Sequence, residues 1–265
     1  MTADITVDLQ DGILTITLDR PTKRNALTDA MYGVLADAIE RADEDRAVRV
    51  VLIRAEGDLF SAGNDMADFG RVAAQLAESS GPASGAMEGM HVWRFLRALA
   101  RSVTPIVAAV QGKAVGVGTT MLLHADHVVL AEDAELITPF VDLALLPEAA
   151  STLLLPRRIG HLRSFAMFAL GESMPAAQAV TAGLANRVVP ADQLDDAARQ
   201  VAAALAARPA GSLTATKRLM RDADELTGVM ERELAAFADR LAGPEAAEAL
   251  TAFAERRAQD FTRFS

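Results

Sequence analysis

The chain has 265 residues, of which 51% are hydrophobic and 23% charged, so it can bury the core of one large globular domain. A net charge of −10 argues against sequence-independent binding to nucleic acid or to an anionic membrane, because both partners attract a basic surface. The chain has no cysteine, which excludes disulfides and thiolate nucleophiles, and it has no leader-like or membrane-length apolar run, so we expect a cytoplasmic protein.

The N-terminal quarter predicts a hairpin, a helix and a third strand. Apolar and polar residues alternate over residues 5–9 and 14–18, on either side of the turn dipeptide Asp11-Gly12. Thr28 is a good N-cap for a helix with one apolar stripe, and residues 48–53 read as the next strand. The fold therefore opens with an antiparallel pair.

The middle of the chain continues this alternation. Helices and strands are expected, in chain order, over residues 66–78, 89–101, 106–110, 128–130 and 135–138. The glycine- and serine-rich segment 79–85 is predicted to be a loop beside the site. Alternation of strands and helices favours the α/β class.

The pattern changes after Pro190 to alanine-rich helices without a strand signal. Four helices are expected, over residues 192–207, 212–222, 224–241 and 244–261. We therefore divide the chain into a core over residues 1–190 and a helical region over residues 191–265. Such a region either joins subunits or packs on its own core, and the sequence leaves both alternatives open.

Two glycine-bearing loops follow predicted strands. Gly116 and Gly118 flank Val117 just before a predicted helix start, and a loop over residues 60–65 follows the strand at 48–53. Glycine lets the backbone approach a ligand, and the first N–H groups of a helix are free to bind an oxyanion. The alternative is two tight turns without a ligand.

Four segments of the chain together resemble one known family. FSAGND, AAVQGKAVGVGTT, ITPFVDLALLPEAAST and TAGLANRVVP occur in this order over nearly the whole chain. They resemble the enoyl-CoA hydratase/isomerase (crotonase) superfamily. The resemblance implies an α/β spiral of ββα turns, an acyl-CoA thioester as substrate, and a homotrimer or dimer of trimers packed through the C-terminal helices. It implies no metal or redox cofactor, because the charge that develops in the reaction is one oxyanion, and CoA is itself part of the substrate.

The resemblance also implies site residues. Two backbone N–H groups hold the thioester oxygen in this family, and the matching positions are Asn64 and Val117, the second of which is usually glycine. Val117 can serve if its φ is negative. CoA contacts are implied at Lys23, Arg24, Ala62, Asp65 and Met66.

The carboxylates depart from the hydratase pattern. Hydratases of the family carry two glutamates, at the positions of Thr120 and Phe140, and neither residue here can act as a base. Glu148 instead matches the base of the Δ3,Δ2-enoyl-CoA isomerase branch. Its leucine and alanine neighbours also predict burial, which would raise its pKa toward neutrality. The alternative is an ordinary first-turn helix glutamate after Pro147.

We therefore predict an isomerase that moves a double bond from C3 to C2 of an acyl-CoA. Glu148 would carry the proton, while Asn64 and Val117 would hold the dienolate oxygen. Hydration of 2-enoyl-CoA, hydrolysis of a CoA thioester and non-catalytic acyl-CoA binding stay open as alternatives. His124 and His127 have no nearby carboxylate cluster that would complete a metal site.

Overall fold

The computed structural model describes residues 4–78 and 83–264 of the chain. Its strands form two sheets, one with the order β1-β2-β3-β4-β6-β9 and a smaller one with the order β5-β7-β8. The strands are β1 (Ile5–Gln10), β2 (Ile13–Leu18), β3 (Val50–Ala55), β4 (Ile106–Val110), β5 (Lys113–Val115), β6 (His127–Ala131), β7 (Glu135–Ile137), β8 (Met174–Pro175) and β9 (Arg187–Val189).

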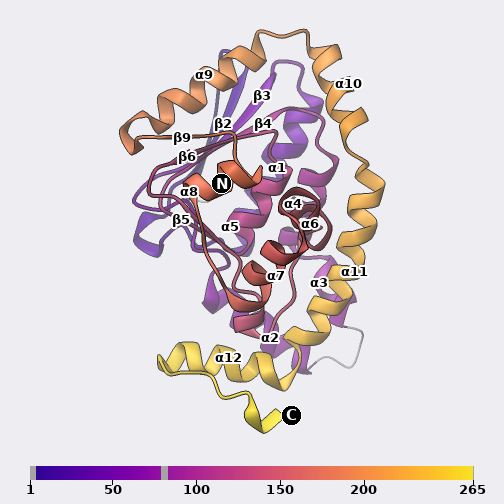
Figure 1. Ribbon diagram of the computed structural model, residues 1–265. Helices are drawn as coiled ribbons and strands as arrows, with labels where there is room; N and C mark the ends of the chain where they lie inside the picture. The colour runs from indigo at the N-terminus through magenta and orange to yellow at the C-terminus, as the bar shows by residue number, and fades with distance from the viewer. Residues whose placement is uncertain (1–3, 79–82, 265) are drawn as a thin grey trace.

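Helices surround both sheets (Figure 1). Those that the described residues form are α1 (Asp29–Glu44), α2 (Met66–Glu78), α3 (Ala83–Glu88), α4 (His91–Arg101), α5 (Val117–Thr120), α6 (Ser151–Ile159), α7 (His161–Leu170), α8 (Ala176–Ala182), α9 (Leu194–Ala206), α10 (Ala210–Met220), α11 (Ala223–Leu241) and α12 (Pro244–Glu255). Short 3₁₀ segments include η1 (Pro21–Lys23) and η2 (Met121–His124).

The predicted N-terminal hairpin is confirmed. β1 and β2 pair antiparallel, and Asp11 (φ 53°) and Gly12 (φ 78°) form the tight left-handed turn between them. The remaining strands of the large sheet add in parallel from β2 to β9. The strand expected from Val48 begins two residues later, because the Val48 N–H donates to the Asp45 carbonyl oxygen in a turn (2.9 Å).

The central strands β2, β3 and β4 of the large sheet are buried on both faces, as parallel strands require. Val50 and Leu52 of β3 pack against α9, whereas Val51 and Ile53 point to the opposite face, toward the main core with α1 and α4. α9 accordingly lies across the strands in Figure 1. One member of the C-terminal helical region therefore covers the chain's own sheet.

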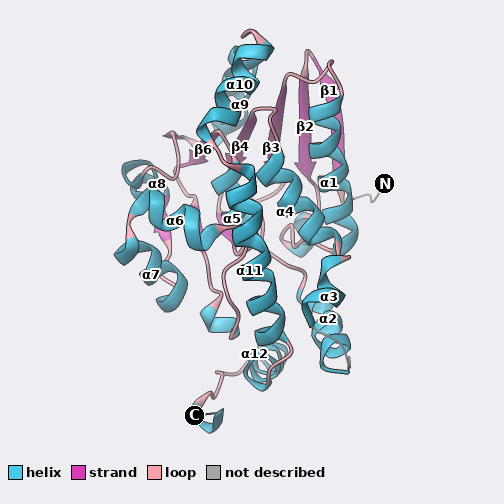
Figure 2. Ribbon diagram, turned by 90° about the vertical axis from the view of Figure 1, so that its right-hand side faces the viewer, coloured by secondary structure: helices cyan, strands magenta, loops and turns pink. Residues whose placement is uncertain are grey.

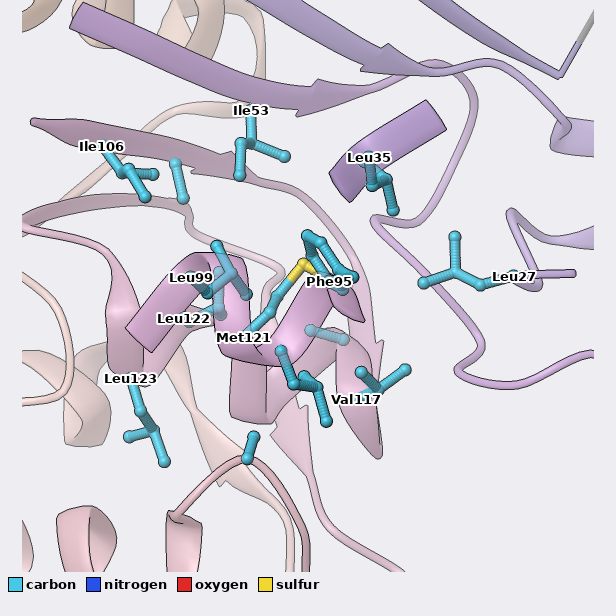
Figure 3. Close-up of a cluster of buried hydrophobic side chains, with 14 of the residues drawn as sticks. Leu27, Leu35, Ile53, Phe95, Leu99, Ile106, Val117, Met121, Leu122 and Leu123 are labelled. Carbon is cyan, nitrogen blue, oxygen red and sulfur yellow. The ribbon is translucent and has the colours of Figure 1, made fainter. Parts of the chain in front are cut away.

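The main core extends from the sheet to the glycine-rich turn. Figure 3 shows the Val117 side chain in the same apolar cluster as Met121 and Phe95, below Ile53 and Ile106 of the neighbouring strands. Val117 is 2% exposed. Packing of its side chain fixes the orientation of the first residue of α5.

α11 is the second C-terminal helix that packs on the chain itself. It packs against α2, α3 and α4. It leads to α12, as Figure 2 shows. Its buried residues include Met230, Leu234 and Phe237. The C-terminal region thus contributes to the same core as the strands.

Two expectations about segment boundaries need correction. Residues 79–82 of the predicted loop lie outside the described residues, but 83–85 belong to α3, where contacts with α4 and α11 outweigh local propensity. The last helix ends at Glu255 rather than at residue 261, because Arg256 takes a left-handed conformation (φ 55°) and its N–H bonds back to the helix.

Large apolar side chains remain exposed on three helices. They are Leu162, Phe165 and Leu170 of α7, Leu219 and Met220 of α10, and Phe253 of α12. Leu219 is 90% exposed, at the end of a helix whose one buried residue is Lys217. No helix in the described ranges has both the length and the hydropathy to cross a membrane.

We expect the protein to sediment as a threefold assembly that buries part of this apolar surface. Replacing Leu219 and Met220 together by Asp should shift the sedimenting mass toward the monomer, whereas Thr216→Asp on the same helix should not. Analytical ultracentrifugation at micromolar concentration measures this. A wild-type monomer would contradict the expectation.

Candidate active site

Two loops that are far apart in sequence dock on each other through Ser61. The Ser61 N–H donates to the Lys113 carbonyl oxygen (3.2 Å), and the Val115 N–H donates to the Ser61 carbonyl oxygen (2.9 Å). Glycine is favoured on both sides of this contact. A Cβ on Gly118 would lie 3.1 Å from the Ser61 Cβ, and one on Gly63 would lie 2.9 Å from the Val115 oxygen. The predicted pair of loops is therefore one structural unit.

The backbone N–H of Asn64 faces away from Leu27. Leu27 bonds to the residues on either side, donating to the Gly63 oxygen (2.8 Å) and accepting from the Asp65 N–H (2.9 Å). In such a parallel bridge the N–H of the residue between, Asn64, faces the opposite side. Within the described part of the chain it has no backbone acceptor.

Val117 presents its N–H at the start of α5. Gly116 precedes it with φ 56° and ψ −120°, a conformation that favours glycine. Val117 itself does not have a positive φ, so its backbone N–H meets the condition stated above for use as a donor. As the first residue of a helix, it has an N–H without an intrahelical acceptor.

Asn64, Val117 and Glu148 line one cavity of about 400 Å³. Its walls are mostly apolar and aromatic, and the Phe237 ring of α11 meets Phe69 and Trp93 edge-on at centroid distances of 6.1 and 6.2 Å. Such a pocket suits an apolar acyl group with a few polar contacts.

Glu148 is the buried carboxylate of this cavity. Its side chain is 5% exposed, and its Oε1 accepts from the Thr120 hydroxyl (2.5 Å). Oε2 has no partner among the described residues. Burial raises the pKa of Glu148 to about 8; the Thr120 hydrogen bond opposes this shift and the nearby Glu233 adds to it. Glu148 precedes the N-cap of α6, Ala150, so the interpretation as a first-turn helix residue is wrong.

Two residues of this site were not recognised from the sequence. Thr120 was assessed only as a missing glutamate, yet its hydroxyl contacts Glu148. Tyr32 of α1 also lines the cavity, and its hydroxyl donates to the Asn64 Oδ1 (2.5 Å). Burial, followed by the charge of Glu148, raises the pKa of Tyr32 well above its ordinary value. Tyr32 is the chain's single tyrosine, which was the available signal.

The predicted CoA-contacting positions lie around the first loop. Ala62 and Met66 line a second cavity of about 60 Å³ that also includes Asn64 and Val117. Lys23 and Arg24 line neither cavity; both are exposed on and after η1, and their side chains have no ionic partner within the described residues. Ala62 is joined to this turn, because its N–H donates to the Arg24 carbonyl oxygen (2.9 Å).

Asp65 uses its side chain to begin α2. Its Oδ1 accepts from the Ala67 (3.0 Å) and Asp68 (3.3 Å) N–H groups, and its Oδ2 accepts from Arg20 (2.7 Å). Burial acts to raise the pKa of Asp65, but these hydrogen bonds, that of Arg20 foremost, hold it below its ordinary value. Both backbone groups of Asp65 are paired as well: its N–H donates to the Leu27 carbonyl oxygen (2.9 Å), and its carbonyl oxygen accepts from the Phe69 N–H (2.9 Å).

The chain belongs to the enoyl-CoA hydratase/isomerase family, whose sequence profile matches residues 8–263. It is 34% identical over 260 residues to the 1,2-epoxyphenylacetyl-CoA isomerase of Escherichia coli, covering 96% of each chain. It is 31% identical to the 2,3-dehydroadipyl-CoA hydratase of the same organism, covering 98% of each. The crystal structure of an enoyl-CoA hydratase/isomerase from Pseudoalteromonas atlantica superposes with a TM-score of 0.88 at 39% identity, over 98% of this chain and all of the other. The predicted family and the crotonase-like α/β fold are thereby confirmed.

Replacing Glu148 by Gln should stabilise the fold at alkaline pH. The folded-state pKa of about 8 lies above the ordinary 4.5, so the wild type loses stability as pH rises between these values. Glutamine has no charge to desolvate. Calorimetry should therefore find the Tm difference, variant minus wild type, more positive at about pH 9 than at about pH 5.

The exposed Glu88 supplies the control, since Glu88→Gln makes the same chemical change outside the cavity. A flat difference for Glu148→Gln would mean that Glu148 ionises as easily as a surface carboxyl.

Proposed function

We propose that this protein shifts the double bond of a 3-enoyl-CoA to the 2-position. The observation that carries the proposal is one buried carboxylate, Glu148, with a free oxygen in the same cavity as Asn64 and Val117. Thr120 and Phe140 occupy the positions of the two hydratase glutamates. A shift between C2 and C4 needs only one group that accepts and returns a proton.

The proposed reaction has two proton transfers. The Asn64 and Val117 N–H groups donate to the thioester oxygen and stabilise the dienolate when Glu148 takes a proton from C2. The same carboxyl then returns the proton to C4, and the double bond comes to lie between C2 and C3. A pKa of about 8 suits both halves, because the group must gain and lose a proton near neutrality.

We also propose that CoA extends from the thioester toward the first loop. The exposed cations Lys23 and Arg24 would attract its phosphates, and the backbone at Ala62 and from Asp65 to Met66 would contact the adenine. The second cavity supports this path, because Ala62 and Met66 share it with both proposed oxyanion donors.

Glu148→Gln should lower the rate of 3-enoyl-CoA isomerisation by about 10² to 10⁴-fold, because glutamine keeps the shape but cannot accept a proton. The affinity for an acyl-CoA should change little, since the backbone donors remain. Ultraviolet absorbance of the conjugated product measures the rate, and calorimetric titration measures binding. Glu88→Gln again supplies the control.

The wild-type assay also decides among the alternatives. Faster hydration of 2-enoyl-CoA than isomerisation of 3-enoyl-CoA would make the protein a hydratase, and release of free CoA would make it a hydrolase. Binding without turnover would make it a non-catalytic subunit. An unchanged isomerisation rate in Glu148→Gln would remove this residue from the mechanism.

Thr120→Val should move the pH midpoint of kcat/KM to higher pH. The wild-type value should rise with pH and level off above about 8, because the free base must be ionised to act. The Thr120 hydroxyl stabilises the ionised form, so its loss raises the pKa of Glu148 further. A midpoint that stays in place would show that this hydrogen bond has no effect on the base.

A further inference from the structure

The backbone directly after Glu148 is held in an unfavourable conformation. Ala149 (φ 63°) and Ala150 (φ 53°) are consecutive left-handed residues, and neither is glycine. Each costs about 1–3 kcal/mol and persists only where the surroundings impose it. Both side chains are fully buried. Groups around this turn must therefore hold it, and the structure contains two that bond to its backbone.

The first group is His124, at the end of η2. Its Nε2 lies 2.8 Å from the Ala149 carbonyl oxygen, and the Arg221 Nη2 lies 2.7 Å from its Nδ1. A guanidinium can only donate, so Nδ1 accepts and Nε2 carries the hydrogen that Ala149 receives. Burial, then the charge of Arg221, lowers the pKa of His124 well below its ordinary value and keeps the ring neutral. Both ring nitrogens are thus committed to the protein.

The second group is Glu233, on the opposite side of the turn in α11. Its Oε2 accepts from the Ala150 N–H (2.7 Å), and its Oε1 accepts from the N–H (3.0 Å) and hydroxyl (2.5 Å) of Thr152. Ala150 is the N-cap of α6 and has no side chain that could cap the helix itself. Glu233 therefore supplies the missing acceptors from another helix.

We propose that His124 and Glu233 are positioning residues that clamp the Ala149–Ala150 turn and so aim the Glu148 carboxylate at the reacting carbons. The proposal rests on the function proposed above for Glu148. Val117, Thr120 and His124 belong to one continuous helical segment, so the same segment offers an oxyanion donor, a hydrogen bond to the carboxylate and a hydrogen bond to its turn.

Glu233 also acts on the base by its charge. Burial raises the pKa of Glu233 to about 7, with the Thr152 hydrogen bonds opposing, and its anion disfavours ionisation of Glu148. The other ionisable groups that face these residues are Tyr32 at Glu148, Arg232 at Glu233, and Arg158, Lys217 and Arg221 at His124. Tyr32 and His124 stay neutral near pH 7 to 8, so the two glutamates are the groups of this cluster that change charge there.

The decisive comparison is Glu233→Gln against Glu225→Gln. Each substitution removes a carboxylate of α11 that bonds to α6 or to the residue just before this helix. Glu225, however, pairs with exposed Arg157 (2.7 Å) and does not touch the turn. For Glu233→Gln we expect kcat to fall by about 10- to 100-fold, because a small displacement of the base suffices for such a loss. The Kd for an acyl-CoA should stay within about twofold, and the kcat/KM midpoint should move to lower pH.

A merely structural cap would lower Tm without these changes. Wild-type kcat and midpoint in a folded Glu233→Gln would overturn the proposal. Should that variant fail to fold, a comparison of two His124 variants decides. His124→Gln keeps an N–H near the Nε2 position, so it should retain a higher kcat than His124→Leu, while the two bind acyl-CoA with equal affinity. Equal kcat in the two would also overturn it.

One readout does not depend on the proposed reaction. The Tm advantage of Glu148→Gln over the wild type should be smaller, and should level off at a lower pH, when both proteins carry Glu233→Gln, because Glu148 then ionises more easily. If the wild type fails to isomerise 3-enoyl-CoA but this shift appears, the proposed function fails while the coupling to Glu148 stands. If isomerisation occurs without the shift, the electrostatic part of the clamp is wrong.

Discussion

The site depends on one backbone contact, the pair of hydrogen bonds between Ser61 and β5. Ser61 is fully buried, and its hydroxyl adds bonds to the Asn25 carbonyl oxygen (2.8 Å) and from the Gly63 N–H (3.1 Å). Two hydrogen bonds therefore tie the loop before Asn64 to the strand before Val117, and the two bonds of the hydroxyl hold that loop to Asn25 and within itself. Buried backbone groups that lost these partners would be left unpaired at a cost of about 1–3 kcal/mol each, so the two loops keep one relative position. Preorganised donors of this kind need no rearrangement when charge develops on a substrate.

The buried carboxylates illustrate the conflict between stability and function in this molecule. Glu148 and Glu233 lie in surroundings that disfavour their charge, with pKa values raised to about 8 and about 7. With apolar residues of the same shape at these two positions, the chain would fold with a smaller desolvation penalty at neutral pH. The left-handed alanines after Glu148 add backbone strain at the same place. A concentration of ionic and conformational cost at one turn is typical of a functional site rather than of a structural core.

The C-terminal helices complete the site as well as the fold. α9 covers one face of the large sheet, while α11 places Phe237 in the wall of the cavity and Glu233 against the turn after Glu148. Residues separated by more than eighty positions therefore meet within hydrogen-bond distance. α10 and α12 keep exposed apolar side chains.

Much of the fold and part of the site could be predicted from the sequence, because those features are local. The hairpin follows from alternation around Asp11-Gly12, the start of α1 from Thr28, and the turn before Val117 from its flanking glycines. Burial of Glu148 follows from its apolar neighbours. Tertiary structure alone decided the partners. Thr120, Tyr32, His124 and Glu233 are ordinary residues in their own segments, and no local period marks the residues that they contact. Their roles arise where α1, α5, η2 and α11 meet around Asn64 and Glu148, and only the folded chain determines such long-range contacts.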